Sequence, residues 1–220
     1  MFFTTILKYV VVSIVICLLY GIQVFSASMI KKISNDKFKG SYLFQFWGLV
    51  LAIILWKLYP EKIFIFNTHN VWKLKNIVLI LICVIPTSII AYHGKKDKPK
   101  KTFNIENFLN GASMEIPQRL LVQNLFVVLG IDGAIYGPVT LAILLNAIIW
   151  VQFIIIQEIM EGKKVSFNII PEITASFWFS IWVGIIYGIT GNIVVAMLTH
   201  GLQRFCTYSV LGKLQTNKSS

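Results

Sequence analysis

Residues 111–120 read Gly-Ala-Ser-Met-Glu-Ile-Pro-Gln-Arg-Leu and place a charged pair inside a segment otherwise suited to lipid. Glu115 and Arg119 are four residues apart, so on a helix they share a face and can pair. Each charge alone would be costly at membrane depth, so the pair is expected to face the protein interior. Two interpretations are open at this point: a structural ion pair, or part of a functional site.

The composition around this stretch is that of a membrane protein. Of the 220 residues, 56% are hydrophobic and only 13% are charged, and the mean hydropathy is +0.74. These values exclude an ordinary soluble domain. A spanning helix needs about 20 residues, so there is room for about six to eight spans and little else. The predicted fold class is all-α, a polytopic helical membrane protein with about seven transmembrane helices and one interfacial segment.

The net charge of +11 does not indicate nucleic-acid binding, because nearly all lysines lie between the apolar runs. In that position they report membrane orientation and attraction to lipid headgroups. The three cysteines, Cys17, Cys83 and Cys206, lie in or beside apolar runs without C-x-x-C spacing. They predict neither a disulfide framework nor a zinc site, and no cofactor or metal is expected.

The apolar runs give the expected spans. They cover about 4–27, 42–58, 77–92, 105–131, 136–159, 167–189 and 193–208. Residues 60–76 mix aromatic side chains with lysines and predict an interfacial segment. The first run has small residues near its end, but its apolar core is long for a signal peptide, so a retained helix is expected. The hydrophilic stretch 94–101 is the predicted boundary between an N-terminal part, 1–104, and a core, 105–220.

Lysine counts predict the orientation. The loops 28–41, 93–105 and 160–167 and the tail after Gly212 hold thirteen lysines, and the opposite side holds five. The positive-inside rule therefore puts the lysine-rich loops and the C-terminus in the cytoplasm of a bacterial cell and the N-terminus outside. This orientation requires that 60–76 does not itself cross the membrane.

Polar side chains collect in the apolar runs of the second half. They are Glu115, Arg119, Asn146, Gln152, Gln157, Glu158, His200, Gln203 and Arg204. A single buried histidine is usually a hydrogen-bonded packing residue, but Arg204 follows His200 by four residues and shares its face. Because each such group is costly in a span, we expect His200 and Arg204 to join Glu115 and Arg119 in one interior cluster.

Three blocks resemble a known family. They are Gly-Ala-Ser-Met-Glu-Ile-Pro-Gln-Arg (111–119), Asn-Ala-Ile-Ile-Trp (146–150) and Tyr-Gly-Ile-Thr-Gly-Asn-Ile-Val-Val-Ala-Met-Leu-Thr-His-Gly-Leu (187–202). Their order and spacing are similar to the CPBP family, the CAAX prenyl protease and bacteriocin-processing membrane proteins, also called Abi proteins. The likeness covers about residues 105–210, while the first half is similar only in being hydrophobic and helical.

The family motifs are E-E-x-x-x-R, F-x-x-x-H and H-x-x-x-N. In the first, Glu115 and Arg119 match, but Met114 stands where the first glutamate is expected. In the third, His200 matches and Arg204 replaces the asparagine.

The second motif allows two frames. Trp150 with Ile154 is one, and Phe153 with Gln157 is the other, and neither frame supplies a histidine.

The resemblance implies a reaction in which the first glutamate activates a water and a histidine and the asparagine stabilise an oxyanion. Met114 cannot accept a proton, and Ile154 can neither bind a metal nor act as a base. Arg204 can stabilise a developing negative charge. With Met114 in place of the first glutamate, Glu115 is the motif carboxylate left to act as the general base. The sequence therefore resembles a family member with a degraded catalytic centre.

Three functions follow as alternatives. The favoured one is a protease-impaired membrane protein that binds a peptide, a bacteriocin or a membrane-protein partner, for example in self-immunity. The second is an active intramembrane endopeptidase that depends on Glu115, Arg119 and His200. The third is a small transporter, because charged residues inside spans also line substrate paths.

Overall fold

The computed structural model describes residues 2–33, 42–63, 65–67, 73–94, 105–160 and 170–211, except for the side chains of residues 2, 31–33, 94, 157, 158 and 160. The described elements, in chain order, are α1 (Phe2–Ile33), α2 (Leu43–Leu58), α3 (Leu74–Gly94), α4 (Ile105–Glu115), η2 (Ile116–Gln123), α5 (Asn124–Val128), β1 (Ala134–Tyr136), β2 (Val139–Thr140), α6 (Leu141–Met160), α7 (Ile170–Thr190), α8 (Ile193–Phe205) and η4 (Cys206–Val210). The predicted all-α class is confirmed. The predicted boundary at 94–101 falls almost entirely outside the described residues.

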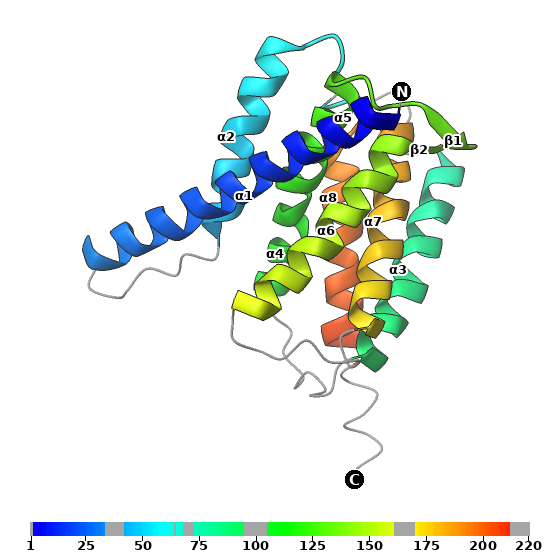
Figure 1. Cartoon of the computed structure of the whole chain (residues 1–220). Coiled ribbons are helices and arrows are strands. Elements are labelled where there is room, and N and C mark those ends of the chain that lie inside the picture. The colour runs from blue at the N-terminus through cyan, green and yellow to red at the C-terminus, as the bar shows by residue number, and fades with distance from the viewer. Residues whose placement is uncertain are drawn as a thin grey trace.

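The helices form one bundle to which both halves of the chain contribute. α3, α4, α6, α7 and α8 run side by side, and α1 crosses the bundle obliquely (Figure 1). α4 packs against α8, both α3 and α6 pack against α7, and α2 packs against η2. The segment with Glu115 and Arg119 therefore lies between helices from both halves.

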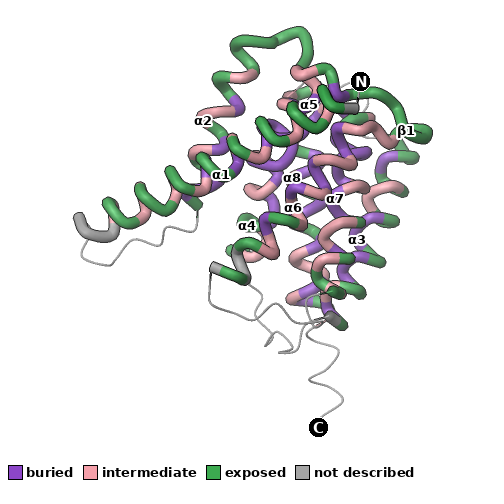
Figure 2. Tube along the Cα trace, viewed as in Figure 1, coloured by how far each residue is buried: buried purple, intermediate pink, exposed green. Residues whose placement is uncertain are grey.

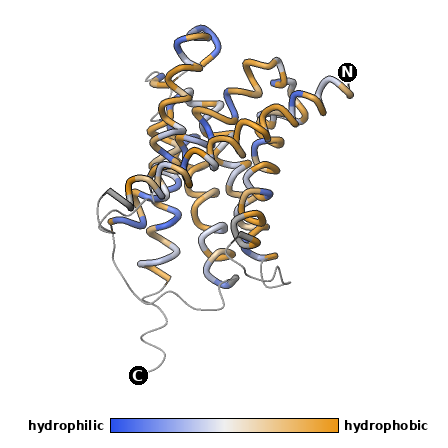
Figure 3. The backbone as a smooth tube through the Cα atoms, turned by 60° about the vertical axis from the view of Figure 1, so that its left-hand side comes forward, coloured by the Kyte–Doolittle hydropathy of each residue, from blue (hydrophilic) through white to orange (hydrophobic). Residues whose placement is uncertain are grey.

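Within the described residues, three helices are long and apolar enough to cross a membrane: Phe3–Ile30, Leu74–His93 and Ile170–Thr190. Leu43–Leu58 and Leu141–Ile156 are apolar but shorter. Hydrophobic residues run along most of the helices (Figure 3), and much of α1 is exposed while purple, buried residues concentrate within the bundle (Figure 2). Membrane association thus has structural support, whereas seven spans are not confirmed by helix length.

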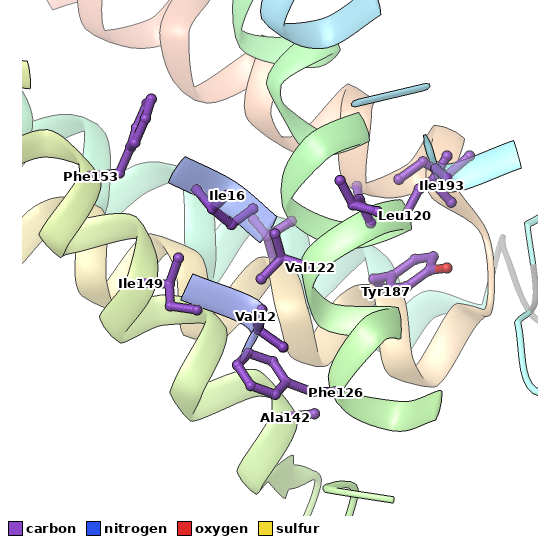
Figure 4. Close-up of a cluster of buried hydrophobic side chains, with 14 of the residues drawn as sticks. Val12, Ile16, Leu120, Val122, Phe126, Ala142, Ile149, Phe153, Tyr187 and Ile193 are labelled. Carbon is purple, nitrogen blue, oxygen red and sulfur yellow. The ribbon is translucent and has the colours of Figure 1, made fainter. Parts of the chain in front are cut away.

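Apolar side chains from distant parts of the chain make the core. Val12 of α1, Phe126 of α5, Ala142 of α6 and Val183 of α7 are each at most 1% exposed and belong to one cluster. Figure 4 shows Val12, Phe126 and Ala142 together on one side of the η2–α5 stretch. Leu120 and Ile193 lie on its other side. This core attaches α1 to the C-terminal half, because α1 contributes buried residues to it.

Residues 105–128 form one continuous helical stretch whose middle is π-helical, between Ile116 and Gln123. The π segment has Pro117 at its start, and proline supplies no N–H for a regular helical bond. α2 crosses at this point, because a Cβ on Gly48 would lie 2.9 Å from Cβ of Pro117. The sequence predicted the helix but not this widened turn, a feature often found at functional sites.

The end of this helix lies earlier than the predicted residue 131. Gly130 has φ +70, Ile131 N–H donates to Phe126 O at 2.8 Å, and Gly130 N–H donates to Val127 O at 3.0 Å. This is the Schellman arrangement, in which a left-handed glycine closes the helix.

A small hairpin follows, with β1 and β2 antiparallel. Gly137, at φ +53, and Pro138 lie in its turn. The span predicted from residue 136 therefore begins later than expected, since α6 begins at Leu141.

Part of the segment before α3 is described, and it contacts the start of α8. Phe66 forms an antiparallel bridge with Asn192, Asn67 N–H donates to Gly191 O at 3.1 Å, and Ile193 N–H donates to Ile65 O at 3.0 Å. Residues 65–67 thus lie against the turn between α7 and α8. Residues 68–72 of the predicted interfacial segment lie outside the described residues.

Candidate functional site

The centre of the site is a buried triad of Glu115, Arg119 and His200. Nε of Arg119 donates to Oε2 of Glu115 at 2.9 Å, and Oε1 of Glu115 lies 2.5 Å from Nδ1 of His200. Glu115 and Arg119 are both 0% exposed, and His200 is 5% exposed. Of the cluster expected from the sequence, Glu115, Arg119 and His200 therefore meet, and both carboxylate oxygens of Glu115 are engaged among them.

Arg119 is held by more than the carboxylate. Its Nη1 donates to Oε1 of Gln123 at 3.2 Å, and its Nη2 donates to the carbonyl oxygen and hydroxyl of Ser180 at 2.9 and 3.1 Å. These bonds satisfy several donors of the guanidinium in a water-excluded interior, where unpaired donors are costly. Sequence reasoning missed Gln123 and Ser180, although Gln123 continues the spacing of 115 and 119 by a further four residues.

His200 is oriented by two contacts. Its Nδ1 faces Glu115, and its ring lies 4.6 Å, centroid to centroid, from that of Phe179 on α7. When Nδ1 carries the proton and donates to the carboxylate, Nε2 is left as an acceptor. Within the described part of the chain, Glu115 supplies the one hydrogen bond of the imidazole.

His200 also lines a small cavity of about 60 Å³, here called the His200 cavity. Five elements contribute to its wall, through Ala91 of α3, Trp150 of α6, Glu172 and Phe179 of α7, His200 and Arg204 of α8, and Tyr208 of η4. Glu115 and Arg119 are not among its lining residues. Of the triad, His200 therefore lines this cavity, and Glu115 and Arg119 lie behind it.

Two glycines allow α4 and α8 to approach closely. A Cβ on Gly111 would lie 2.6 Å from Cγ of Arg204 and 3.1 Å from the carbonyl oxygen of His200. A Cβ on Gly201 would lie 2.6 Å from Cε2 of Phe108. The absence of side chains at 111 and 201 is what brings His200 within reach of Glu115.

The substituted motif positions lie around this centre. Sδ of Met114 lies 3.3 Å from Nε2 of Gln45 on α2. Arg204 donates from Nη1 to the hydroxyl of Tyr208 at 3.2 Å and lines the His200 cavity. Trp150 lines that cavity too, whereas Ile154, one helical turn further along α6, is not among the residues of its wall.

The other polar residues of α6 lie elsewhere. Asn146 is 1% exposed and shares a very small void with Gln118. Gln152 accepts a hydrogen bond from the hydroxyl of Tyr9 at 2.6 Å and so faces α1. The side chains of Gln157 and Glu158 lie outside the described residues. The structure thus gathers Glu115, Arg119, His200 and Arg204, and directs Asn146 and Gln152 to other neighbours.

A second, larger hollow lies on the other face of η2. It has a volume of about 780 Å³ and an almost wholly apolar wall, with Ile116 and Leu120 facing α2 residues such as Trp56 and the α8 residue Met197. The side chains of η2 therefore divide between a charged interior and an apolar groove.

Among the described residues, no group of three or more His, Cys, Asp and Glu side chains is arranged to hold a metal ion. Comparison of the chain with protein-family models, with curated proteins and with solved structures found no match. The function must therefore be argued from the geometry of the site.

Proposed function

We propose that this chain is a protease-impaired membrane protein that binds a peptide, a bacteriocin or a membrane-protein partner, and that it acts in self-immunity. The fold it uses would be that of the CPBP family, which residues 105–210 resemble. It would be located in the bacterial cell membrane, with the lysine-rich loops and the C-terminus in the cytoplasm.

The observation that carries the proposal is the enclosure of Glu115. Both of its oxygens are engaged, by Arg119 and His200, and the side chain is 0% exposed. A general base must reach the proton that it abstracts, directly or through one water. The position before it is Met114, whose thioether cannot take the proton instead. The triad therefore suits a rigid support for a binding surface better than a reaction centre.

The proposed orientation is supported by two lysines from the lysine-poor side. The ammonium of Lys8 on α1 donates to Leu129 O, and that of Lys62 donates to Val128 O at 3.5 Å. Both therefore lie at the C-terminal end of α5, where cations interact favourably with the helix dipole. α8 ends at the opposite end of the bundle from α5 (Figure 1).

An active intramembrane endopeptidase is the second candidate, and one specific observation favours it. His200 is oriented by a carboxylate at Nδ1 and lines a cavity, an arrangement in which Nε2 can accept a proton from a substrate or a water. Under this alternative Glu115 is an orienting group, and His200 is the base.

Expression in a bacteriocin-sensitive host tests the favoured proposal. Cells that carry the chain should tolerate a higher bacteriocin concentration than cells with an empty vector, and Glu115→Gln should abolish the gain by loosening the triad. Exposed Glu106→Gln on the same stretch is the matched control and should leave tolerance unchanged. Unchanged killing of cells with the wild-type chain counts against the proposal.

Turnover assays separate the two candidates. Purified protein incubated with fluorogenic and prenylated peptides should show no cleavage under the favoured proposal. Cleavage that disappears in His200→Ala would support the endopeptidase instead. The double variant Met114→Glu/Ile154→His restores the two missing motif residues, and a gain of cleavage would show that only the motif has decayed.

A further inference from the structure

The wall of the His200 cavity includes the guanidinium of Arg204, which has no charge partner among the described residues. Arg204 is half-buried, and its one hydrogen bond within the described ranges goes to the neutral hydroxyl of Tyr208, at 3.2 Å. No carboxylate of the described residues is within ion-pair distance of it. Arg119, by contrast, has Glu115 at 2.9 Å. A partly desolvated guanidinium beside an open cavity is a site at which an anion is expected.

We propose that the His200 cavity binds the C-terminal carboxylate of an apolar peptide or protein tail, through Arg204 and His200. This inference rests on the proposed binding function and names the chemical group that is bound. The guanidinium presents its donors in a planar fork, which matches the two oxygens of a carboxylate. His200 adds a donor from Nε2 in its imidazolium form, in which both ring nitrogens carry a proton and Nδ1 still donates to Glu115.

The other residues of the cavity wall favour a carboxylate over a phosphate group. Glu172 is exposed and lines the same cavity. Its negative charge repels a dianion such as phosphate about twice as strongly as it repels a singly charged carboxylate. The cavity holds only about 60 Å³, enough for a small group rather than a headgroup. Trp150 and Phe179 offer apolar surface for the side chain of the terminal residue.

Peptide binding to the full chain in lipid nanodiscs tests the inference, with isothermal titration calorimetry as the measurement. The probes are acetyl-Leu-Ala-Leu as the free acid, the same tripeptide as the C-terminal amide, decanoate, and inorganic phosphate. The free acid should bind at least about tenfold more tightly than the amide. The amide has no carboxylate and so loses the charged hydrogen bonds to Arg204. Phosphate should bind more weakly than the free acid.

Variants then locate the site. Arg204→Gln should weaken binding of the free acid about tenfold and leave the amide unchanged, and Arg204→Lys should retain part of the affinity because it keeps the charge but not the fork. Lys57→Gln removes an exposed positive charge outside the cavity wall and should change nothing. Size-exclusion and thermal-unfolding profiles that match wild type show that a variant is folded.

The following results would overturn the inference or the proposed function. Equal binding of acid and amide, no binding of either, or an unchanged affinity in Arg204→Gln removes the carboxylate site. Tighter binding of decanoate than of the tripeptide makes a fatty acid the source and overturns the peptide assignment. If wild type and Arg204→Gln raise bacteriocin tolerance equally, the proposed function is supported, but the Arg204 site is not needed for it. Absence of tolerance in wild type removes the proposed function itself.

Discussion

Oε1 of Glu115 lies 2.5 Å from Nδ1 of His200, although the two residues are 85 positions apart in the sequence. The same carboxylate binds Arg119 through its other oxygen at 2.9 Å. One acid thus joins the stretch α4–η2 to α8 in the water-excluded centre of the bundle. The stability of this junction can be measured separately from any activity.

Breaking the Glu115–Arg119 pair should be more damaging than removing it. Glu115→Gln leaves a buried guanidinium without its carboxylate and should lower the free energy of unfolding by about 3–5 kcal/mol. Arg119→Met should have a similar effect, whereas the double variant Glu115→Gln/Arg119→Met should lose less than the sum of the two single variants. Unfolding in detergent, followed by circular dichroism, gives the four values, and strictly additive losses would contradict the pairing.

The fork of Arg119 should matter as well as its charge. Arg119→Lys keeps a cation beside Glu115 but cannot reach Gln123 and Ser180 at the same time, so we expect a loss of about 2–3 kcal/mol. Ser180→Ala is the milder comparison, because Nη2 keeps the carbonyl oxygen of residue 180, and should cost about 1 kcal/mol. Equal effects in the two variants would show that only the charge is required.

Close contact between α4 and α8 predicts that alanine is not tolerated at Gly111. A Cβ there would lie 3.1 Å from the carbonyl oxygen of His200 and 2.6 Å from Cγ of Arg204, and overpacking of this kind costs about 1–3 kcal/mol. Gly188 of α7 is the matched control, because a Cβ there meets nothing within 4 Å. Gly188→Ala should be neutral or stabilising by up to about 1 kcal/mol, as judged by the melting temperature in nanodiscs.

Asn192 serves two neighbours at the start of α8. Its Oδ1 accepts from Val194 N–H at 2.9 Å, and its Nδ2 donates to Asn67 O at 3.0 Å. Asn192→Asp keeps the helix cap but loses the donor, and Asn192→Ala loses both. We expect Asn192→Ala to lower stability by about 1–2 kcal/mol and Asn192→Asp by less. Equal losses in the two variants would show that the bond to residue 67 dominates and that the helix cap contributes little.

The sequence by itself determined the all-α class with its long apolar helices and the pairing of Glu115 with Arg119. Both depend on local information: apolar runs of spanning length in the first case, and a spacing of four on one helix face in the second. The widened turn at Pro117, the glycine that ends the helix at Val128 and the hairpin before α6 were not predicted. They depend on where backbone hydrogen bonds find partners, which residue periodicity does not specify.

Only the tertiary structure decided which polar residues of different helices meet. It turned His200 and Arg204 toward α4, and it turned Asn146 and Gln152 away from them. The physical reason is close packing: helices approach where Gly111 and Gly201 leave room, and that approach fixes the face that each helix presents to its neighbours.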